Sequence, residues 1–126
     1  MTDNEVVMYL VFRADLNMPK GKIAAQAGHA VQLAMLEIDN RAEPAGRDRA
    51  FLREWEDGSY TKIALKVADE AELNALCAAL DKGDLLYARV VDEGRTVVEA
   101  GTTTALGIQP LPRSQVKPYV QKLKLL

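Results

Sequence analysis

The chain alternates short apolar runs with longer amphipathic segments. Residues 5–13 (EVVMYLVFR) form a nearly continuous apolar run, rich in β-branched and aromatic side chains. Such a run predicts a strand buried on both faces. Residues 60–67 (YTKIALKV) alternate between apolar and polar positions, which predicts a second strand. Further strands are predicted at residues 86–91 and 102–109.

The segments between these strands have helical periodicity. Helices are predicted at residues 20–40, 47–56, 69–81 and 114–123, the last on a weaker pattern. The first spans about five turns, and one apolar stripe along it is formed by Ile23, Ala27, Ala30, Ala34 and Ile38. Asp69 is placed to cap the third helix, with Glu72 three residues further on as in a capping box.

The order of these elements predicts an α/β domain with layers of helix on a sheet. The stretch between the third and fourth strands is too short for a helical crossover, so these two strands should be antiparallel neighbours. We therefore expect a three-layer α/β/α fold with a four-stranded mixed sheet. No repeat, low-complexity segment or linker divides the sequence, so residues 1–126 are expected to form a single domain.

Composition narrows the classes of protein. The chain has 126 residues, of which 48% are hydrophobic and 27% charged, which fits one folded domain and not a disordered chain. A single cysteine, Cys77, excludes an intrachain disulfide and a cysteine-rich zinc site. There is no apolar run long enough for a membrane span, and acids stand where a signal peptide needs basic residues. A cytoplasmic protein without a membrane partner is expected.

The net charge of −2 argues against a globally basic nucleic-acid binder, so any polyanion would have to meet a local basic patch. Lys20 and Lys22 lie at the start of the long helix, where the helix dipole disfavours cations unless an anion completes the site. Two solvated lysines at a fraying end are the alternative. Lys22, Gln26 and His29 share one helical face, which suits either a functional site or a polar helix edge.

Two further segments carry candidate chemistry. Asp92 follows the third strand, where open α/β sheets tend to place ligand sites, and it could act as a base, a lysine partner or a turn former. Thr102 and Thr104 point to one face of the fourth strand and Thr103 to the other. Strand propensity alone explains threonines here, but a glycine before paired hydroxyls could also shape an oxyanion or phosphate contact. Cys77 lies on a predicted core face and is interpreted as packing.

Several segments together resemble one family. Residues 15–26 (DLNMPKGKIAAQ), followed by His29 and Ala30, resemble the DLxMxKGKxAAQxxHA signature of the archaeal and eukaryotic-type (type 2) peptidyl-tRNA hydrolases. Residues 55–67, with their tryptophan, glycine and KIALKV run, resemble a second segment of that family. Residues 92–96 (DEGRT) resemble its DAGRT motif, residues 101–108 its GTxTVLAIGP stretch, and residues 123–126 its LKLL ending.

The resemblance implies a compact α/β domain, often dimeric, that hydrolyses the ester between a peptide and the 3′ end of tRNA without a metal or organic cofactor. It carries the active-site residues over onto Lys22, Asp92, Thr96 and Thr104. It also implies that substrate binding or site shape involves further residues of these motifs: Lys20, Gln26, His29, Arg95 and Thr102. In that scheme Asp92 orients or activates water, Lys22 stabilises an oxyanion or holds a terminal phosphate, and the threonine hydroxyls position the reacting groups.

The chain departs from the family pattern at Pro19, Gly28, Glu93 and Gln109. Glu93 puts a second carboxylate beside Asp92, which could repel RNA or raise the pKa of a neighbouring carboxyl. Two other functions therefore stay open at this point. One is a family member that binds RNA or protein without turnover, and the other is an esterase for a different nucleotide-linked substrate. For RNA contact we expect a local patch of Lys20, Lys22 and Arg95, with Arg13 as a further candidate.

Overall fold

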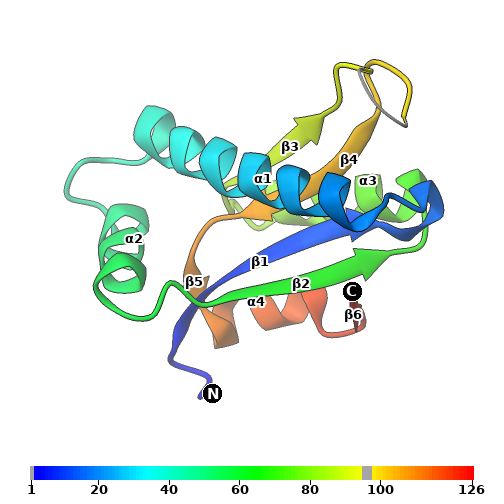
Figure 1. Cartoon of the computed structure of the whole chain (residues 1–126). Helices are drawn as coiled ribbons and strands as arrows, with labels where there is room; N and C mark the ends of the chain where they lie inside the picture. The colour runs from blue at the N-terminus through cyan, green and yellow to red at the C-terminus, as the bar shows by residue number, and fades with distance from the viewer. Residues whose placement is uncertain (1, 95–97) are drawn as a thin grey trace.

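The computed structural model describes residues 2–94 and 98–126 (Figure 1). The α-helices are α1 (Lys20–Arg41), α2 (Arg47–Asp57), α3 (Glu70–Lys82) and α4 (Arg113–Val120). The strands are β1 (Val6–Arg13), β2 (Lys62–Val67), β3 (Tyr87–Val91), β4 (Thr103–Ile108), β5 (Leu111–Pro112) and β6 (Lys124–Leu125). A short 3₁₀ helix, η1 (Ala14–Leu16), joins β1 to the loop before α1. None of the helices in the described part of the chain is long and apolar enough to cross a membrane.

The sheet is mixed, as the sequence predicts. β1 is parallel to β2 and antiparallel to β4, and β3 and β4 are antiparallel neighbours. The strand order is β3-β4-β1-β2-β6, and β5 pairs with β1 outside this path. The prediction of four strands is wrong, because the sheet of the described residues has six. The two missed strands, β5 and β6, have two residues each, too few to show the two-residue periodicity that identifies a strand.

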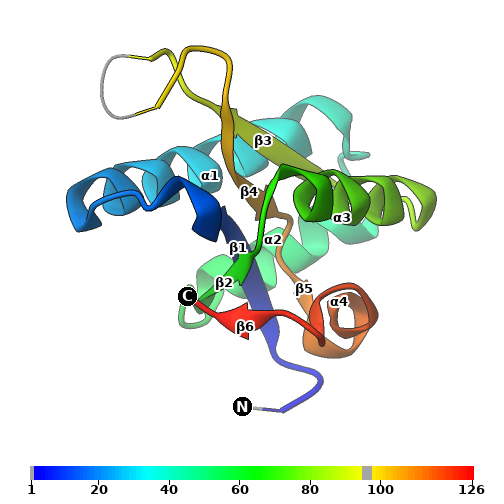
Figure 2. The same ribbon diagram turned by 90° about the vertical axis from the view of Figure 1, so that its right-hand side faces the viewer.

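Helices cover both faces of this sheet, which gives three layers (Figure 2). All eight residues of β1 are buried, as expected of its apolar run. Met8, Leu10 and Phe12 pack with α1 and α2 in one core cluster. Val7 and Val11 belong to a second cluster, formed with α3 and α4. The alternation of side chains along a strand therefore supplies both cores from a single strand.

Helix α1 packs directly against β4. Gly107 of β4 packs under Ala30 and Ala34, both of which are buried in the apolar stripe of α1. A Cβ atom at residue 107 would be 2.3 Å from the carbonyl oxygen of Ala30, so no larger residue fits there without moving the helix. Small residues on the helix and a glycine on the strand thus set the distance between α1 and the sheet. That distance fixes where the first two turns of α1 stand above the ends of β3 and β4.

Helix and strand ends agree with the sequence to within a few residues. The capping role of Asp69 is confirmed, since its Oδ1 accepts a hydrogen bond of 3.0 Å from the backbone N–H of Glu72. β2 begins two residues later than expected because Tyr60 adopts a positive φ of 53°, which a strand does not allow. α4 begins one residue earlier than expected. It ends at Val120, three residues before the end of the helix predicted at residues 114–123.

Candidate active site

A cleft of about 790 Å³ lies between α1 and the carboxyl end of β3. Its lining comes from two directions. α1 contributes Lys22, Gln26 and His29, and the other side is formed by Val91, the last residue of β3, and by Asp92, which follows it. These residues lie far apart in the sequence and meet because α1 packs against β3, which ends at Val91. The resulting site lies at the end of a strand, as predicted for Asp92.

Lys22 and Asp92 form an ion pair through the lysine Nζ and the carboxylate Oδ2. Both side chains are largely removed from solvent, with 13% of Lys22 and 4% of Asp92 exposed. Because the pair is sheltered, its attraction is screened less than that of a surface pair. The geometry therefore agrees with the interpretation of Asp92 as a lysine partner. Lys22 and Asp92 both line the cleft, so the ion pair borders the space in which a ligand would bind.

The surroundings of Asp92 keep it ionised. The hydrogen bond from Lys22 lowers the pKa of the Asp92 carboxyl, and the bond from the backbone N–H of Gly94 acts in the same direction. The charges of Lys22 and His29 add to the effect, while burial opposes it. From the sequence, Glu93 was a candidate for raising the pKa of a neighbouring carboxyl. The pKa of the Asp92 carboxyl is instead lowered. An ionised Asp92 can accept hydrogen bonds from water and hold a cation in place.

Gln26 connects this carboxylate to the sheet. Its Nε2 donates to Asp92 Oδ2 at 3.3 Å and to Thr104 Oγ1 at 2.8 Å. Thr104 Oγ1 in turn approaches the carbonyl oxygen of Val90 at 3.4 Å. Gln26 is 2% exposed and Thr104 is fully buried. The two residues therefore form a buried network beneath Asp92, in which Gln26 borders the cleft and Thr104 does not.

Gly94 contributes to the site and was not predicted to do so, although the Asp-x-Gly sequence of residues 92–94 is typical of a turn. The backbone N–H of Gly94 donates to Asp92 Oδ1 at 2.6 Å, so Asp92 is a turn former as well as a lysine partner. Gly94 has a φ of 79°, and a Cβ there would lie 2.6 Å from the backbone nitrogen of Ala100. Both the left-handed backbone and the lack of space require glycine. The turn fixes one carboxylate oxygen and leaves the other to Lys22 and Gln26.

The remaining predicted residues are spread around this centre. His29 is exposed and lines the cleft beyond Gln26. Lys20 is exposed at the first residue of α1, outside the cleft lining. Thr102 contributes its backbone carbonyl, which accepts from the N–H of Asp92 at 2.8 Å. Arg95 and Thr96, two further predicted site residues, lie outside the described residues.

Arg13, the further candidate for an anion patch, has another role. Its guanidinium donates to both carboxylate oxygens of Asp15, to Glu70, and to the carbonyl of Thr103. It is only 9% exposed, and the hydrogen bond with Asp15 raises the pKa of Arg13. These contacts join the end of β1 to the starts of α3 and β4. The expectation that Arg13 meets RNA is therefore not supported, because its donors already bind protein groups.

Comparison with known proteins identifies the family. Residues 6–126 match the family model described as Peptidyl-tRNA hydrolase PTH2. The chain belongs to this family. The family resemblance inferred from the sequence motifs is thus confirmed. Lys22 and Asp92 both lie within the matched residues.

The chain is 40% identical to a probable peptidyl-tRNA hydrolase 2 of Schizosaccharomyces pombe, over 99% of the chain and 58% of that protein. It is 35% identical to a peptidyl-tRNA hydrolase of Saccharolobus islandicus, over 96% of the chain and 99% of that protein. The chain thus spans under two thirds of the yeast relative and nearly all of the archaeal one. A solved structure of a protein of unknown function from Agrobacterium tumefaciens shares the fold, with a TM-score of 0.54 and 13% identity over 100% of this chain and 99% of that one.

Proposed function

We propose that this chain hydrolyses the ester between a peptide and the terminal ribose of tRNA, and that the Lys22–Asp92 pair is the centre of the reaction. The observation that carries the proposal is the sheltered ion pair, which opens onto a cleft and belongs to family motifs. Family membership supports the reaction class. Neither a binding module without turnover nor an esterase for another substrate is favoured by any of the comparisons.

The chemistry follows from the charges in the cleft. Water adds to the ester carbonyl carbon and gives up one proton, and the carbonyl oxygen becomes an oxyanion. The intermediate then breaks the bond between the carbonyl carbon and the ribose oxygen, and the ribose oxygen takes up the proton that the water gave up. Lys22 Nζ stabilises the oxyanion, since a fixed cation in a sheltered site is most effective where negative charge develops. Asp92 accepts a hydrogen bond from the attacking water and orients it. Because its pKa is lowered, the Asp92 carboxylate is a weak base. We therefore propose that it orients the attacking water and does not remove a proton from it completely.

We propose that Thr104 acts through Gln26 and Asp92 and does not contact the substrate, because it is fully buried and does not line the cleft. Thr104→Val keeps the shape of the side chain and removes the acceptor of the Gln26 amide. We expect kcat to fall roughly threefold to tenfold, the effect of one lost hydrogen bond, with KM unchanged. Thr104→Ser, which retains the hydroxyl, should restore kcat. Steady-state kinetics of the two variants check this, and a fall in Thr104→Ser equal to that in Thr104→Val would contradict it.

The pH dependence follows from the lowered pKa of Asp92. Because the carboxylate stays ionised until the pH falls through that lowered pKa, the wild-type rate should show no loss from Asp92 protonation between about pH 5 and pH 8. Lys22→Met removes the largest cause of the shift, so the pKa of Asp92 should rise. The carboxyl carbon of Asp92 can be followed by NMR titration in both proteins. Identical titration midpoints would show that Lys22 does not hold the carboxylate ionised.

We propose that Lys20 meets a phosphate of the tRNA acceptor end, because it is exposed at the start of α1 beside the cleft. Lys20→Ala should weaken tRNA binding and lower the slope of log Kd against log salt by about 0.7–0.9, the share of one phosphate contact. Lys117→Ala, an exposed lysine on α4, is the matched control and should leave the slope unchanged. Equal slopes for wild type and Lys20→Ala would remove Lys20 from the RNA contact.

His29, Arg95, Thr96 and Thr102 keep the roles that the family resemblance implies, as proposals. We also infer that residues 1–126 act as one hydrolase domain in the cytoplasm, where peptidyl-tRNA arises, and that a homodimer is a form to be tested. The reaction itself is tested with a panel of substrates. Wild-type protein should release tRNA from an N-acetylated aminoacyl-tRNA much faster than it cleaves simple acyl esters of nucleosides. The opposite order of rates would favour the alternative esterase.

A further inference from the structure

We infer that the peptide portion of the substrate binds as an extended strand along the open edge of β3, in a second groove that continues the active-site cleft. The inference rests on the proposed function, because it assigns a place to the peptide of peptidyl-tRNA. It concerns residues outside the Lys22–Asp92 centre. Four features of the fold lead to it: the groove, the free strand edge, the exposed apolar residues and the direction of the strand.

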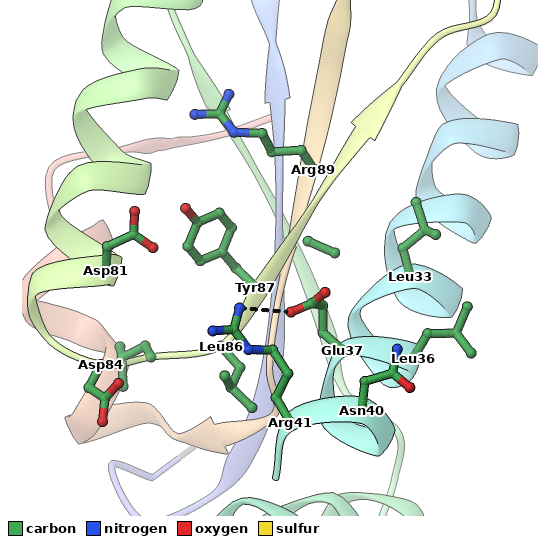
Figure 3. Close-up of a pocket in the computed structure, with 12 residues that line it drawn as sticks. Leu33, Leu36, Glu37, Asn40, Arg41, Asp81, Asp84, Leu86, Tyr87 and Arg89 are labelled. Atoms are coloured by element: carbon green, nitrogen blue, oxygen red, sulfur yellow. Dashed lines mark ion pairs between the residues drawn. The ribbon is translucent and has the colours of Figure 1, made fainter.

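The groove has a volume of about 610 Å³ and runs beside β3 between α1 and the end of α3. Figure 3 shows Leu33 and Leu36 projecting from α1 on one side, with Tyr87 and Asp81 on the other. Leu33 and Leu36 also line the active-site cleft, so the two hollows meet along the same face of α1. The far end of the groove holds the ion pair between Glu37 and Arg41, at 3.5 Å. A ligand in the active site can therefore extend into this groove without leaving the surface.

The backbone of β3 offers hydrogen-bonding groups to such a ligand. Among the described residues β3 pairs with β4 alone, which makes it an edge strand. The carbonyl of Leu86 accepts from Gln109 N–H at 2.9 Å, so the even-numbered residues direct their backbone groups toward β4. In an antiparallel pair these groups alternate, which leaves those of Tyr87 and Arg89 directed outward. An extended peptide satisfies such an edge by adding one more strand.

Exposed apolar side chains lie where the groove joins the cleft. Leu36 on α1 is 48% exposed and Val91 at the end of β3 is 54% exposed. Both line the active-site cleft, and Leu36 lines the groove as well. Apolar side chains left in water at a cleft favour a partner with apolar groups of its own. The side chains of a peptide close to the ester supply them.

The direction of β3 sets the direction of the peptide. The strand runs toward Asp92, so the peptide residue that bears the ester would lie at Asp92 and earlier residues would extend back toward Leu85. The peptide is then parallel to β3. At about 3.3 Å per residue the distance from Leu85 to Asp92 accommodates roughly six peptide residues. Recognition through main-chain hydrogen bonds is indifferent to side-chain identity, which suits a substrate whose peptide sequence varies.

The test compares two substrates that share the same tRNA and C-terminal residue: an N-acetyl-aminoacyl-tRNA and an N-acetyl-hexapeptidyl-tRNA. The readout is the ratio of their kcat/KM values. We expect the longer substrate to be favoured by about tenfold or more in the wild type, the effect of two or more added hydrogen bonds. Arg89→Pro removes an outward N–H from the edge, where proline is tolerated, and Arg89→Ala keeps that N–H. The ratio for Arg89→Pro should fall about threefold to tenfold below that for Arg89→Ala.

A second pair of variants keeps the test independent of the proline. Leu36→Ser changes the apolar junction on the surface of α1, and Leu125→Ser makes the same change at a 69% exposed leucine on β6, at the other end of the sheet. We expect only Leu36→Ser to lower the ratio. Equal kcat/KM for both lengths in the wild type would overturn the peptide groove while leaving the proposed function intact. No hydrolysis of either substrate would overturn both. A dimer that Arg89→Pro converts to monomer, with no effect of length, would assign the edge to a second copy of the chain.

Discussion

Lys22→Ala is expected to lower kcat for peptidyl-tRNA hydrolysis by about 10²- to 10³-fold. The expected size is that of removing one preorganised group that stabilises an oxyanion. Lys22 is 13% exposed and its only described partner in a side-chain ion pair is Asp92, so its loss removes the cation of the cleft and leaves Asp92 without its strongest interaction. Lys117→Ala, on the opposite face, is the matched control. Single-turnover release of tRNA from an N-acetyl-aminoacyl-tRNA measures both.

The Lys22 result separates two roles. If Lys22 acts on the developing oxyanion, kcat falls while the Kd for substrate changes little. If it holds a terminal phosphate instead, Kd rises and the single-turnover rate at saturation is kept. A rate at saturation equal to that of the wild type would therefore contradict the assignment of Lys22 to the oxyanion.

Gly107→Ala is expected to destabilise the fold by about 1–3 kcal/mol, the usual cost of overpacking a close-packed interior. The added Cβ would lie 2.3 Å from the carbonyl oxygen of Ala30 and 2.9 Å from its carbonyl carbon, both backbone atoms of α1. Gly28→Ala is the matched control. Gly28 lies on α1, and a Cβ added there meets no atom within 4 Å. Since alanine favours helix over glycine, Gly28→Ala should stabilise the protein by up to about 1 kcal/mol. Urea unfolding midpoints measure both changes.

The Gly107→Ala substitution should also change the geometry of the active site. Relief of the clash moves α1 away from β4, and α1 carries both Lys22 and Gln26. We expect a lower kcat in Gly107→Ala at temperatures where the variant is still folded. A variant with wild-type stability and activity would show that the contact between α1 and β4 does not set the geometry of the site.

The helical face that carries Lys22, Gln26 and His29 shows which features helical periodicity can predict and which it cannot. Spacing correctly put the three on one side of α1, but it could not rank their distance from the sheet. Gln26 lies nearest and is buried with Asp92 and Thr104, whereas His29 lies further round and is exposed. From the sequence, Asp92 could be a base, a lysine partner or a turn former. In the structure it is both a lysine partner and a turn former, since it pairs with Lys22 and accepts the Gly94 N–H.

Other features depended on tertiary contacts that no local pattern encodes. Arg13 ends a buried strand, and only the fold brings Glu70 and the carbonyl of Thr103 to its guanidinium. Gln109 departs from the family pattern, yet it has a structural role. Its Oε1 accepts from Leu86 N–H at 2.8 Å and its Nε2 donates to Asp48 at 2.8 Å, which joins the residue before β3 to α2. A single buried glutamine with two distant partners leaves no periodic signal in the sequence.

The carboxylate of Asp92 is expected to be needed for the chemical step and not for substrate binding. Asp92→Asn keeps the size of the side chain and removes its charge. The most direct measurement is the single-turnover rate of tRNA release by this variant at saturating N-acetyl-aminoacyl-tRNA, with Kd measured in parallel. We expect binding to be retained and the rate to fall by about 10²-fold or more. A wild-type rate in a folded Asp92→Asn protein would contradict the account.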